Sequence, residues 1–447
     1  MSSSHDDLDV LVRVSAGTPM GNLLRRFWLP ALLVSEVAER DGTPVRIRIL
    51  GEDLVAFRDS NGRLGIVEAY CPHKLAPLFF GRNEQCGLRC VYHGWKFDVT
   101  GACVDIPNVV PPDNYDALRQ RMSITSYPVR EAGGMIWVYM GPKEAMPELP
   151  GMEWLRLPLA QVHASRWLQR SNWVQGLEGE IDTSHISFLH SEKNPSAARG
   201  GQDRLWLTRD GAPQITLKET PFGFVYGARR DYRGQYYWRI TQWMLPMWSA
   251  IPPALDDFNG NGRGWVPIDD YHTTTFGYTY RLDRELNESD LQRLNSGGQF
   301  PPRVQRGSVQ LPHGYMIDAF LPVANKQNDY LIDRDVQRTK TFTGIWGVNE
   351  QDRALQESMA SIPGHPGIVD RTRENLVRSD LPTITARKML VRLARALQGG
   401  EAPEALRDPS LYSRRAISVV SPIADFDELM SEYGKRGEGG QQAVIAA

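Results

Sequence analysis

Two cysteine–histidine pairs lie within 25 residues, and they constrain the fold of this chain more than any other feature of its sequence. The stretch reads CPHKLAPLFFGRNEQCGLRCVYHGW, residues 71–95. Cys71 and His73 are two positions apart, Cys90 and His93 are three apart, and sixteen residues separate the pairs. A straight helix would point residues i and i+2 in different directions, so each pair must lie on a tight loop. Two such loops facing each other would form a cage of four metal ligands.

A cage of two thiolates and two imidazoles fits two kinds of metal site. One is a structural zinc with four tetrahedral ligands, and the other is a two-iron, two-sulfide cluster. Cysteine followed by histidine in both loops favours the cluster, because one of its irons takes thiolates and the other takes imidazoles. A binding protein with a structural zinc stays open as the alternative at this point.

The composition excludes several classes of partner. The 447 residues include 51 Lys and Arg and 53 Asp and Glu, interspersed along the chain, for a formal charge of −2. We therefore expect neither nucleic acid nor an anionic membrane as a partner. Four cysteines are too few for a disulfide scaffold and indicate metal binding or catalysis in a reducing compartment. MSSSHDDLDV lacks a signal-peptide pattern and no apolar run approaches the roughly 18 residues of a membrane span, so we expect a cytoplasmic protein.

The pattern of apolar and polar residues changes near residue 145. Before that point, short runs alternate apolar and polar side chains, and an Asn-Gly pair at 61–62 predicts a hairpin turn. After it, strand-like segments at 214–248 and 273–283 and helical periodicity at 350–397, broken by PGHPG, predict an α+β region. We expect four segments: a lead-in (1–42) that packs on the larger domain, an antiparallel β domain (43–145), the larger domain (146–431) and a disordered tail (432–447).

A second group of potential metal ligands lies in EGEIDTSHISFLH, residues 178–190. On a helix, Glu178, Asp182 and His185 are four and three positions apart and share one face. His190 comes five positions after His185, so the two can converge only if the helix bends, unwinds or ends there. Two imidazoles and a distant carboxylate form the facial triad of non-heme Fe(II) sites that activate dioxygen. Taken alone, the segment also fits a solvated polar helix with incidental histidines.

The first stretch resembles the cluster-binding signature of Rieske oxygenases, carried here by CPH and CVYHGWKFDVTG. The resemblance implies that Cys71 and Cys90 bind one iron of a [2Fe-2S] cluster, and that His73 and His93 bind the other. Respiratory Rieske proteins have an additional cysteine in each loop, and this sequence has none there. That difference favours the oxygenase type.

The second stretch, NWVQGLEGEIDTSHISFLH, resembles the mononuclear-iron motif of the same family's α subunit. The resemblance implies Fe(II) bound by His185 and His190, with the third ligand from a C-terminal helix. NEQDRALQESM matches that helix and makes Asp352 the expected ligand. The remaining implied roles are a carboxylate joining the two metal centres (Asp182) and residues supporting the ligands (Glu178 and Asn172).

The resemblance extends over nearly the whole chain and is greatest to the phthalate dioxygenase branch, whose members act on aromatic carboxylates. It implies a twisted antiparallel sheet wrapped by helices, of the helix-grip type. A carboxylated aromatic substrate needs an apolar slot and a guanidinium, since arginine matches the two carboxylate oxygens. In YYWRITQWM, strand alternation puts Arg239 and Trp243 on one face. Further candidate anchors are Arg229 and Arg204.

These features predict the oxygenase component of a multicomponent enzyme that hydroxylates an aromatic carboxylate, phthalate-like or phenoxy- or chlorobenzoate-like. No Gly-rich dinucleotide fingerprint follows a strand, so electrons from NADH would come through a separate flavin/iron-sulfur reductase. The family implies a homotrimer or a dimer of trimers. One alternative is a monooxygenase that O-demethylates a methoxylated aromatic acid. Another is a pure electron carrier, against which the long second domain and the second metal motif argue.

Overall fold

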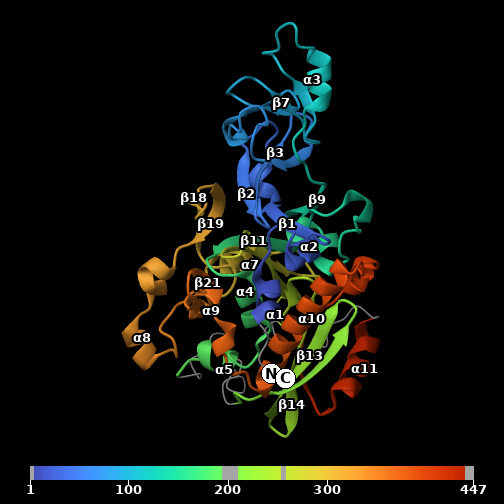
Figure 1. The fold of residues 1–447 in the computed structure, drawn as a ribbon. Coiled ribbons are helices and arrows are strands. Elements are labelled where there is room, and N and C mark those ends of the chain that lie inside the picture. The colour runs from blue at the N-terminus through green and yellow to red at the C-terminus, as the bar shows by residue number, and fades with distance from the viewer. Residues whose placement is uncertain (1–4, 194–209, 253–257, 438–447) are drawn as a thin grey trace.

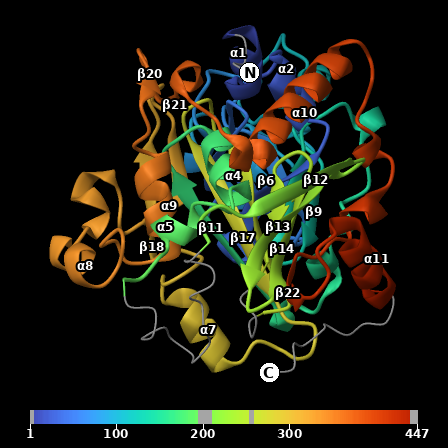
Figure 2. The ribbon, with the colours of Figure 1, turned by 90° about the horizontal axis from the view of Figure 1, so that it is seen from below.

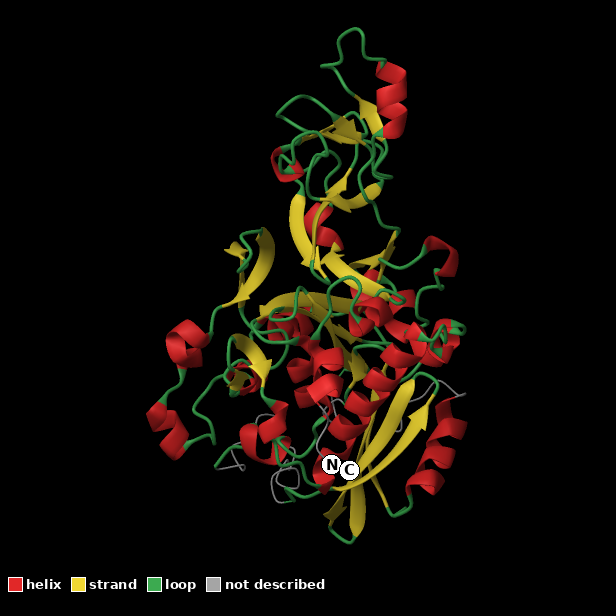
Figure 3. Cartoon of the chain, in the orientation of Figure 1, coloured by secondary structure: helices red, strands yellow, loops and turns green. Residues whose placement is uncertain are grey.

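The computed structural model describes residues 5–193, 210–252 and 258–437. Figure 1 shows an upper lobe of short strands standing on a larger lower lobe in which helices surround a sheet. The same division is visible by secondary structure in Figure 3. The predicted α+β class is therefore confirmed.

The upper lobe is antiparallel β structure, as its alternating sequence predicts. One sheet has the order β2 (Val45–Ile49), β3 (Glu52–Arg58), β4 (Leu64–Glu68), and the other contains β5 (Arg82–Glu84), β6 (Gly87–Arg89), β7 (Lys96–Phe97) and β8 (Cys103–Asp105). The Asn-Gly turn joins β3 to β4, and Gly62 adopts a φ of 80° there. Helix α3 (Tyr115–Arg121) follows, with Asn114 as its N-cap.

A three-stranded sheet lies where the lobes meet. Its order is β1 (Trp28–Leu33), β10 (Met135–Tyr139), β9 (Val129–Ala132). The lead-in before it forms α1 (His5–Val12) and α2 (Pro19–Leu24), and both helices contact α10 (Leu381–Gln398) of the lower lobe. The segment 1–42 therefore contacts the lower lobe, but its strand β1 pairs with β10. The domain division near residue 145 stays a prediction.

The large sheet of the described residues has eight antiparallel strands. Its order is β11 (Val162–Gln169), β17 (Thr273–Tyr280), β16 (Gly260–Pro267), β15 (Trp248–Ala250), β14 (Gln235–Met244), β13 (Gly223–Tyr232) and β12 (Gln214–Thr220), and β22 (Ile417–Ser421) also pairs with β14. Helices α4 (Trp173–Ile181) and α10 lie on one face, where Tyr226 of β13 bonds to α4. Helix α11 (Phe426–Gly437) lies on the other, where Phe426 packs on Trp238.

The C-terminal region agrees with its sequence pattern at one place and differs at another. The break expected at PGHPG is a hairpin of β20 (Ser361–Ile362) and β21 (His365–Val369), which separates α9 (Val348–Gln356) from α10. Gly364 turns this hairpin with a φ of 81° that favours glycine. Helix α11 continues to Gly437, so the first six residues of the segment expected to be disordered, 432–437, are helical. Residues 438–447 lie outside the described part.

The hairpin β18 (Val304–Gln310) and β19 (Met316–Pro322) connects the two lobes. Asp318 accepts a hydrogen bond of 2.7 Å from Arg46, and the Tyr315 hydroxyl donates one of 2.9 Å to the carbonyl oxygen of Leu54. The remaining described α-helices are α5 (Ile186–Leu189), α7 (Glu288–Asn295) and α8 (Arg334–Thr339), and short 3-10 helices lie in the connections. Within the described ranges, no helix has the length and apolar character to cross a membrane.

Candidate iron-sulfur and mononuclear metal centres

The two cysteine–histidine loops of the upper lobe have the same backbone structure. The amide of Leu75 donates to the carbonyl of Cys71 at 2.8 Å, and that of Gly94 donates to Cys90 at 2.9 Å. The cysteine amides donate in turn to residues five positions later, at 2.9 and 2.8 Å. Leu75 and Gly94 also share a positive φ, 55° and 79°. The pairs, spaced by two and by three, therefore lie on equivalent turns.

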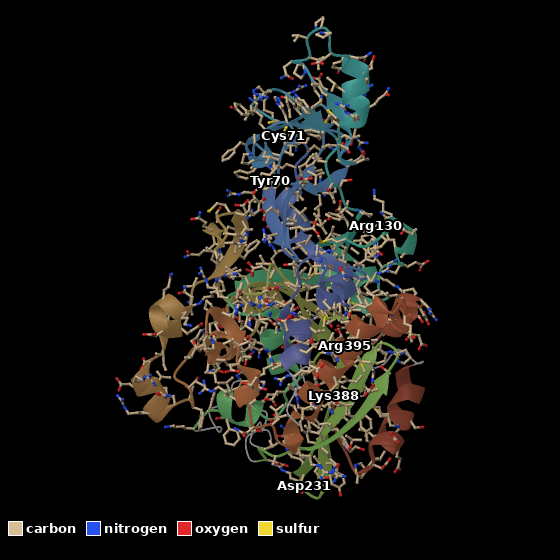
Figure 4. The ribbon with its side chains drawn as sticks, in the orientation of Figure 1. Tyr70, Cys71, Arg130, Asp231, Lys388 and Arg395 are labelled. Carbon is tan, nitrogen blue, oxygen red and sulfur yellow. The ribbon has the colours of Figure 1, made fainter. Side chains whose placement is uncertain are left out.

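The side chains of these loops fit an iron-sulfur cluster. Both cysteines are buried, and the ring centroids of His73 and His93 are 4.4 Å apart. His73 Nδ1 is buried without a hydrogen-bond partner, as expected for an atom that binds metal. Burial raises the pKa of the Cys71 thiol to about 12, and binding to iron would offset this by stabilising the thiolate. The two predicted imidazole ligands are therefore in contact, and Figure 4 places Cys71 in the same upper lobe, whereas the assignment of all four cluster ligands stays a prediction.

The second group of ligands depends on where helix α4 ends. The sequence predicted that Glu178, Asp182 and His185 share one helical face, but α4 ends at Ile181. Tyr226 donates from its hydroxyl to the carbonyl of Ile181 at 2.8 Å. Arg230 donates to the carbonyl of Thr183 at 2.9 Å. Because these sheet side chains satisfy carbonyls at the end of the helix, the chain can turn before His185 and begin α5 after it.

Three side chains converge at this turn. His185 Nε2 and His190 Nε2 are 3.1 Å apart, and Asp352 Oδ1 lies 3.6 Å and 3.2 Å from them. Atoms that each lie about 2.1 Å from one metal ion, at about 90° to one another, are separated by about 3.0 Å. The triangle therefore matches three ligands on one side of an ion. Burial alone would raise the pKa of Asp352, but the two imidazoles lower it.

Asp182 lies behind the first ligand. Its Oδ2 is 3.6 Å from His185 Nδ1, and Ser184 donates to its Oδ1 from the amide at 2.8 Å and from the hydroxyl at 2.6 Å. Burial would raise the pKa of Asp182, yet the bonds from His185 and Ser184 lower it to about 2. A carboxylate on this nitrogen favours the tautomer that leaves Nε2 free for metal.

Small residues let α9 approach α4 closely enough to complete the triad. A Cβ at Gly179 would collide with the Gln356 side chain. Buried amides then join the two helices and β11: Gln169 donates to Gln356 Oε1 at 2.8 Å, and Gln175 donates to the Gln356 carbonyl at 2.7 Å. Figure 2 shows α4, α5 and α9 side by side. The sequence did not reveal these contacts, because they join residues almost 190 positions apart.

Two other residues expected near the iron are placed elsewhere. Asn172 is the N-cap of α4: its side chain accepts from the Val174 amide and donates to the carbonyls of Val12 and Asp270. Glu178 accepts from Arg371 at 2.9 Å and from Arg387 at 2.6 Å. The structure brings neither of them to the metal triad.

We expect Glu178→Gln to lower stability by about 3 kcal/mol or more, since it leaves the buried Arg371 without a carboxylate partner and Arg387 with Glu374 alone. Burial would raise the pKa of Glu178, but the arginines lower it. Its stabilisation is thus present above the ordinary carboxyl pKa and lost as pH falls through the folded value, so the difference should shrink in acid. Chemical denaturation at several pH values measures it. Glu219→Gln, which breaks an exposed pair with Arg392, is the control and should cost less than about 1 kcal/mol.

The candidate substrate arginines lie on different faces of the sheet. Arg239 is opposite Ala228 on β13, between Tyr226 and Arg230, so it lies on the face that carries α4. Arg229 is on the other face, where it donates to the Ala424 carbonyl at 2.5 Å and stacks on Tyr236.

The substrate role of the other two candidates stays untested. Trp243 is fully buried in the core against Phe224, with ring centroids 4.9 Å apart. Arg204 lies outside the described residues.

Comparison with known proteins agrees with both centres. The family model "Rieske [2Fe-2S] domain" matches residues 27–128, and "LigXa C-terminal domain like" matches residues 138–425. The oxygenase subunit of 3-chlorobenzoate-3,4-dioxygenase from Comamonas testosteroni is 38% identical over 98% of this chain and 99% of its own length. The chain belongs to the Rieske non-heme iron oxygenases.

Other relatives place this Rieske oxygenase in the phthalate dioxygenase branch. The phthalate 4,5-dioxygenase oxygenase subunit of Pseudomonas putida is 35% identical, covering 95% of this chain and 94% of its own. The 5,5'-dehydrodivanillate O-demethylase oxygenase subunit of a Sphingobium species is 31% identical, covering 97% and 91%. Dicamba monooxygenase bound to dicamba shares the fold, with a TM-score of 0.54, 15% identity and coverage of 85% of this chain and 100% of that one. The expected family, oxygenase class and cofactors are thereby confirmed.

Proposed function

We propose that this Rieske oxygenase hydroxylates an aromatic carboxylate, with dioxygen and with electrons that a separate NADH-dependent flavin/iron-sulfur reductase supplies. The facial triad carries the proposal, because a metal ion held by only three protein ligands keeps coordination positions for dioxygen chemistry. When bound, the cluster delivers single electrons and the mononuclear iron supplies dioxygen activation. Within the chain, Asp182 holds the Nδ1 proton of His185, and buried helix contacts keep Asp352 in place.

Two guanidiniums on the α4 face of the sheet support an anionic substrate. Arg230 is buried, and burial together with the charge of Arg239 lowers its pKa to about 10. Its Nη1 and the Nε of Arg239 have no hydrogen-bond partner. Among the residues that the structure describes, no carboxylate forms an ion pair with either one. A substrate carboxylate would supply the missing negative charge.

Arg239→Gln should lower kcat/KM for a carboxylated aromatic by about 10- to 100-fold, mostly through KM, since hydrogen bonds to charged groups contribute about 1.5–3 kcal/mol. Steady-state kinetics on the acid and on its neutral amide would measure the change, and the amide should be affected little. The comparison is Arg229→Gln on the opposite face. A larger loss in that variant would overturn the assignment of Arg239.

We further propose that electrons pass between chains. The cluster loops are in the upper lobe, whereas α5 and α9 are in the lower one (Figures 1 and 4). Apolar side chains are exposed at both places: Leu75, Val91 and Tyr92 on the cluster loops, and Phe188, Phe342 and Leu355 around the triad. Docking the first group of one copy onto the second group of another would bury both. In a ring of three copies, or in a dimer of such rings, the cluster loops of every chain can dock onto the triad of a neighbouring chain.

The oligomeric state and the products test these proposals. Light scattering should give three or six chains per particle, and a monomer that turns over would contradict transfer between chains. Products from a panel of aromatic acids and their methyl ethers distinguish ring hydroxylation from O-demethylation. The dehydrodivanillate O-demethylase relative makes the second reaction the alternative. Turnover of neither group of substrates would contradict the substrate class.

A further inference from the structure

Gln351 lies against the second histidine of the triad. It is on α9, directly before Asp352, and only 8% of its surface is exposed. Its Nε2 donates to the carbonyl of Ile345 at 2.9 Å, and its Oε1 lies 2.6 Å from His190 Nδ1. Two adjacent residues of α9 therefore supply a candidate ligand, Asp352, and a contact to a second candidate ligand, His190.

These contacts determine which nitrogen of His190 carries the proton. Because the Gln351 amide nitrogen faces a carbonyl, its oxygen must face the imidazole. A carbonyl oxygen only accepts, so His190 Nδ1 is the protonated nitrogen and donates to it. Nε2 then carries the free lone pair, and it is the atom that points into the triad.

We infer that Gln351 is a positioning residue that holds His190 in its metal-binding tautomer. The inference rests on the proposed iron site. His185 has an anionic partner, Asp182, whereas His190 has a neutral one. The two imidazoles consequently differ in basicity.

Two substitutions separate this role from a merely structural one. Gln351→Glu and Gln351→Leu both remove the donor to Ile345, but only the first keeps an acceptor for His190. The test uses the full-length holoprotein with its cluster intact, after a chelator has removed the mononuclear metal. Equilibrium dialysis with Co(II) measures affinity, and the Co(II) ligand-field bands report coordination geometry. Cluster absorption and melting temperature check folding, with Gln351→Met as a second apolar variant should the leucine variant fail to fold.

The expected result is a 10- to 100-fold weaker Co(II) affinity and altered bands in the apolar variant, the usual range for losing a partner of a metal-bound histidine. Gln351→Glu should stay within about threefold of the wild-type affinity, with unchanged bands. If both variants lose Co(II) affinity equally, only the contact with Ile345 matters, and the positioning role of Gln351 is overturned. Unchanged Co(II) affinity in both variants would overturn it as well. If the wild type itself takes up no Co(II), the iron site fails, and this inference with it.

Discussion

Replacing His185 with alanine is expected to lower product formation by about 10³-fold or more while the cluster keeps its visible absorption. The substitution removes one corner of a triangle whose other ligand atoms, on His190 and Asp352, are 3.2 Å apart. A bound metal contributes several kcal/mol to catalysis, and each 1.36 kcal/mol is a factor of ten. The cluster loops are in the other lobe and share no residue with this site.

Metal analysis and single-turnover product yield measure the outcome together. The variant should retain the iron and sulfide of the cluster and lose the mononuclear iron, and its reduced cluster should give an unchanged EPR spectrum. His313→Ala is the matched control, because that histidine lies on the turn between β18 and β19, 3.7 Å from Asp53. Retained turnover in His185→Ala would reject the assignment of the mononuclear site.

The cluster loops could be predicted from sequence because all four ligands lie within 25 residues and each pair is confined to one turn. Part of the large sheet was also predictable, since 214–248 divides into β12, β13 and β14 at its Gly and Pro turns and 273–283 contains β17. Strands β11, β16 and β22 were not predicted from the sequence. The proposed triad was harder, because Asp352 is more than 160 positions from His190. Resemblance to a known family, not spacing, identified it.

The partners of those ligands could not be predicted, because they depend on tertiary contacts. Periodicity grouped Glu178 with Asp182 and His185, but hydrogen bonds from Tyr226 and Arg230 accompany the end of α4 before Asp182. Glu178 then points to arginines of the C-terminal region. Gln351 had one weak signal, its place directly before Asp352 in NEQD. The pairing of its side chain with His190 became evident only in the folded chain.

Asp182 is the residue that we propose as the connection between the two centres. Its Oδ2 faces His185, while 28% of its side chain is exposed, the largest fraction among Asp182 and the three triad residues. Of these four side chains, it can therefore be reached most easily from outside the chain. A cluster histidine of another copy, presented by a loop with an apolar rim, could donate to the same carboxylate. Asp182 would then hydrogen-bond to an imidazole at each end of the electron path.

Asp182→Asn should slow electron transfer from the reduced cluster by about 100-fold, the upper range for losing a partner of a metal-bound histidine, while both metal centres remain. Asparagine has nearly the same shape, but it offers His185 and an incoming imidazole a neutral amide in place of an anion. Stopped-flow absorbance of the prereduced protein, mixed with dioxygen and substrate, follows cluster oxidation. Asp335→Asn on the exposed helix α8 is the control. If the cluster of the Asp182→Asn variant is oxidised at the wild-type rate with full iron content, the electrons do not pass through Asp182. A different group would then have to lie between the two centres of the docked copies.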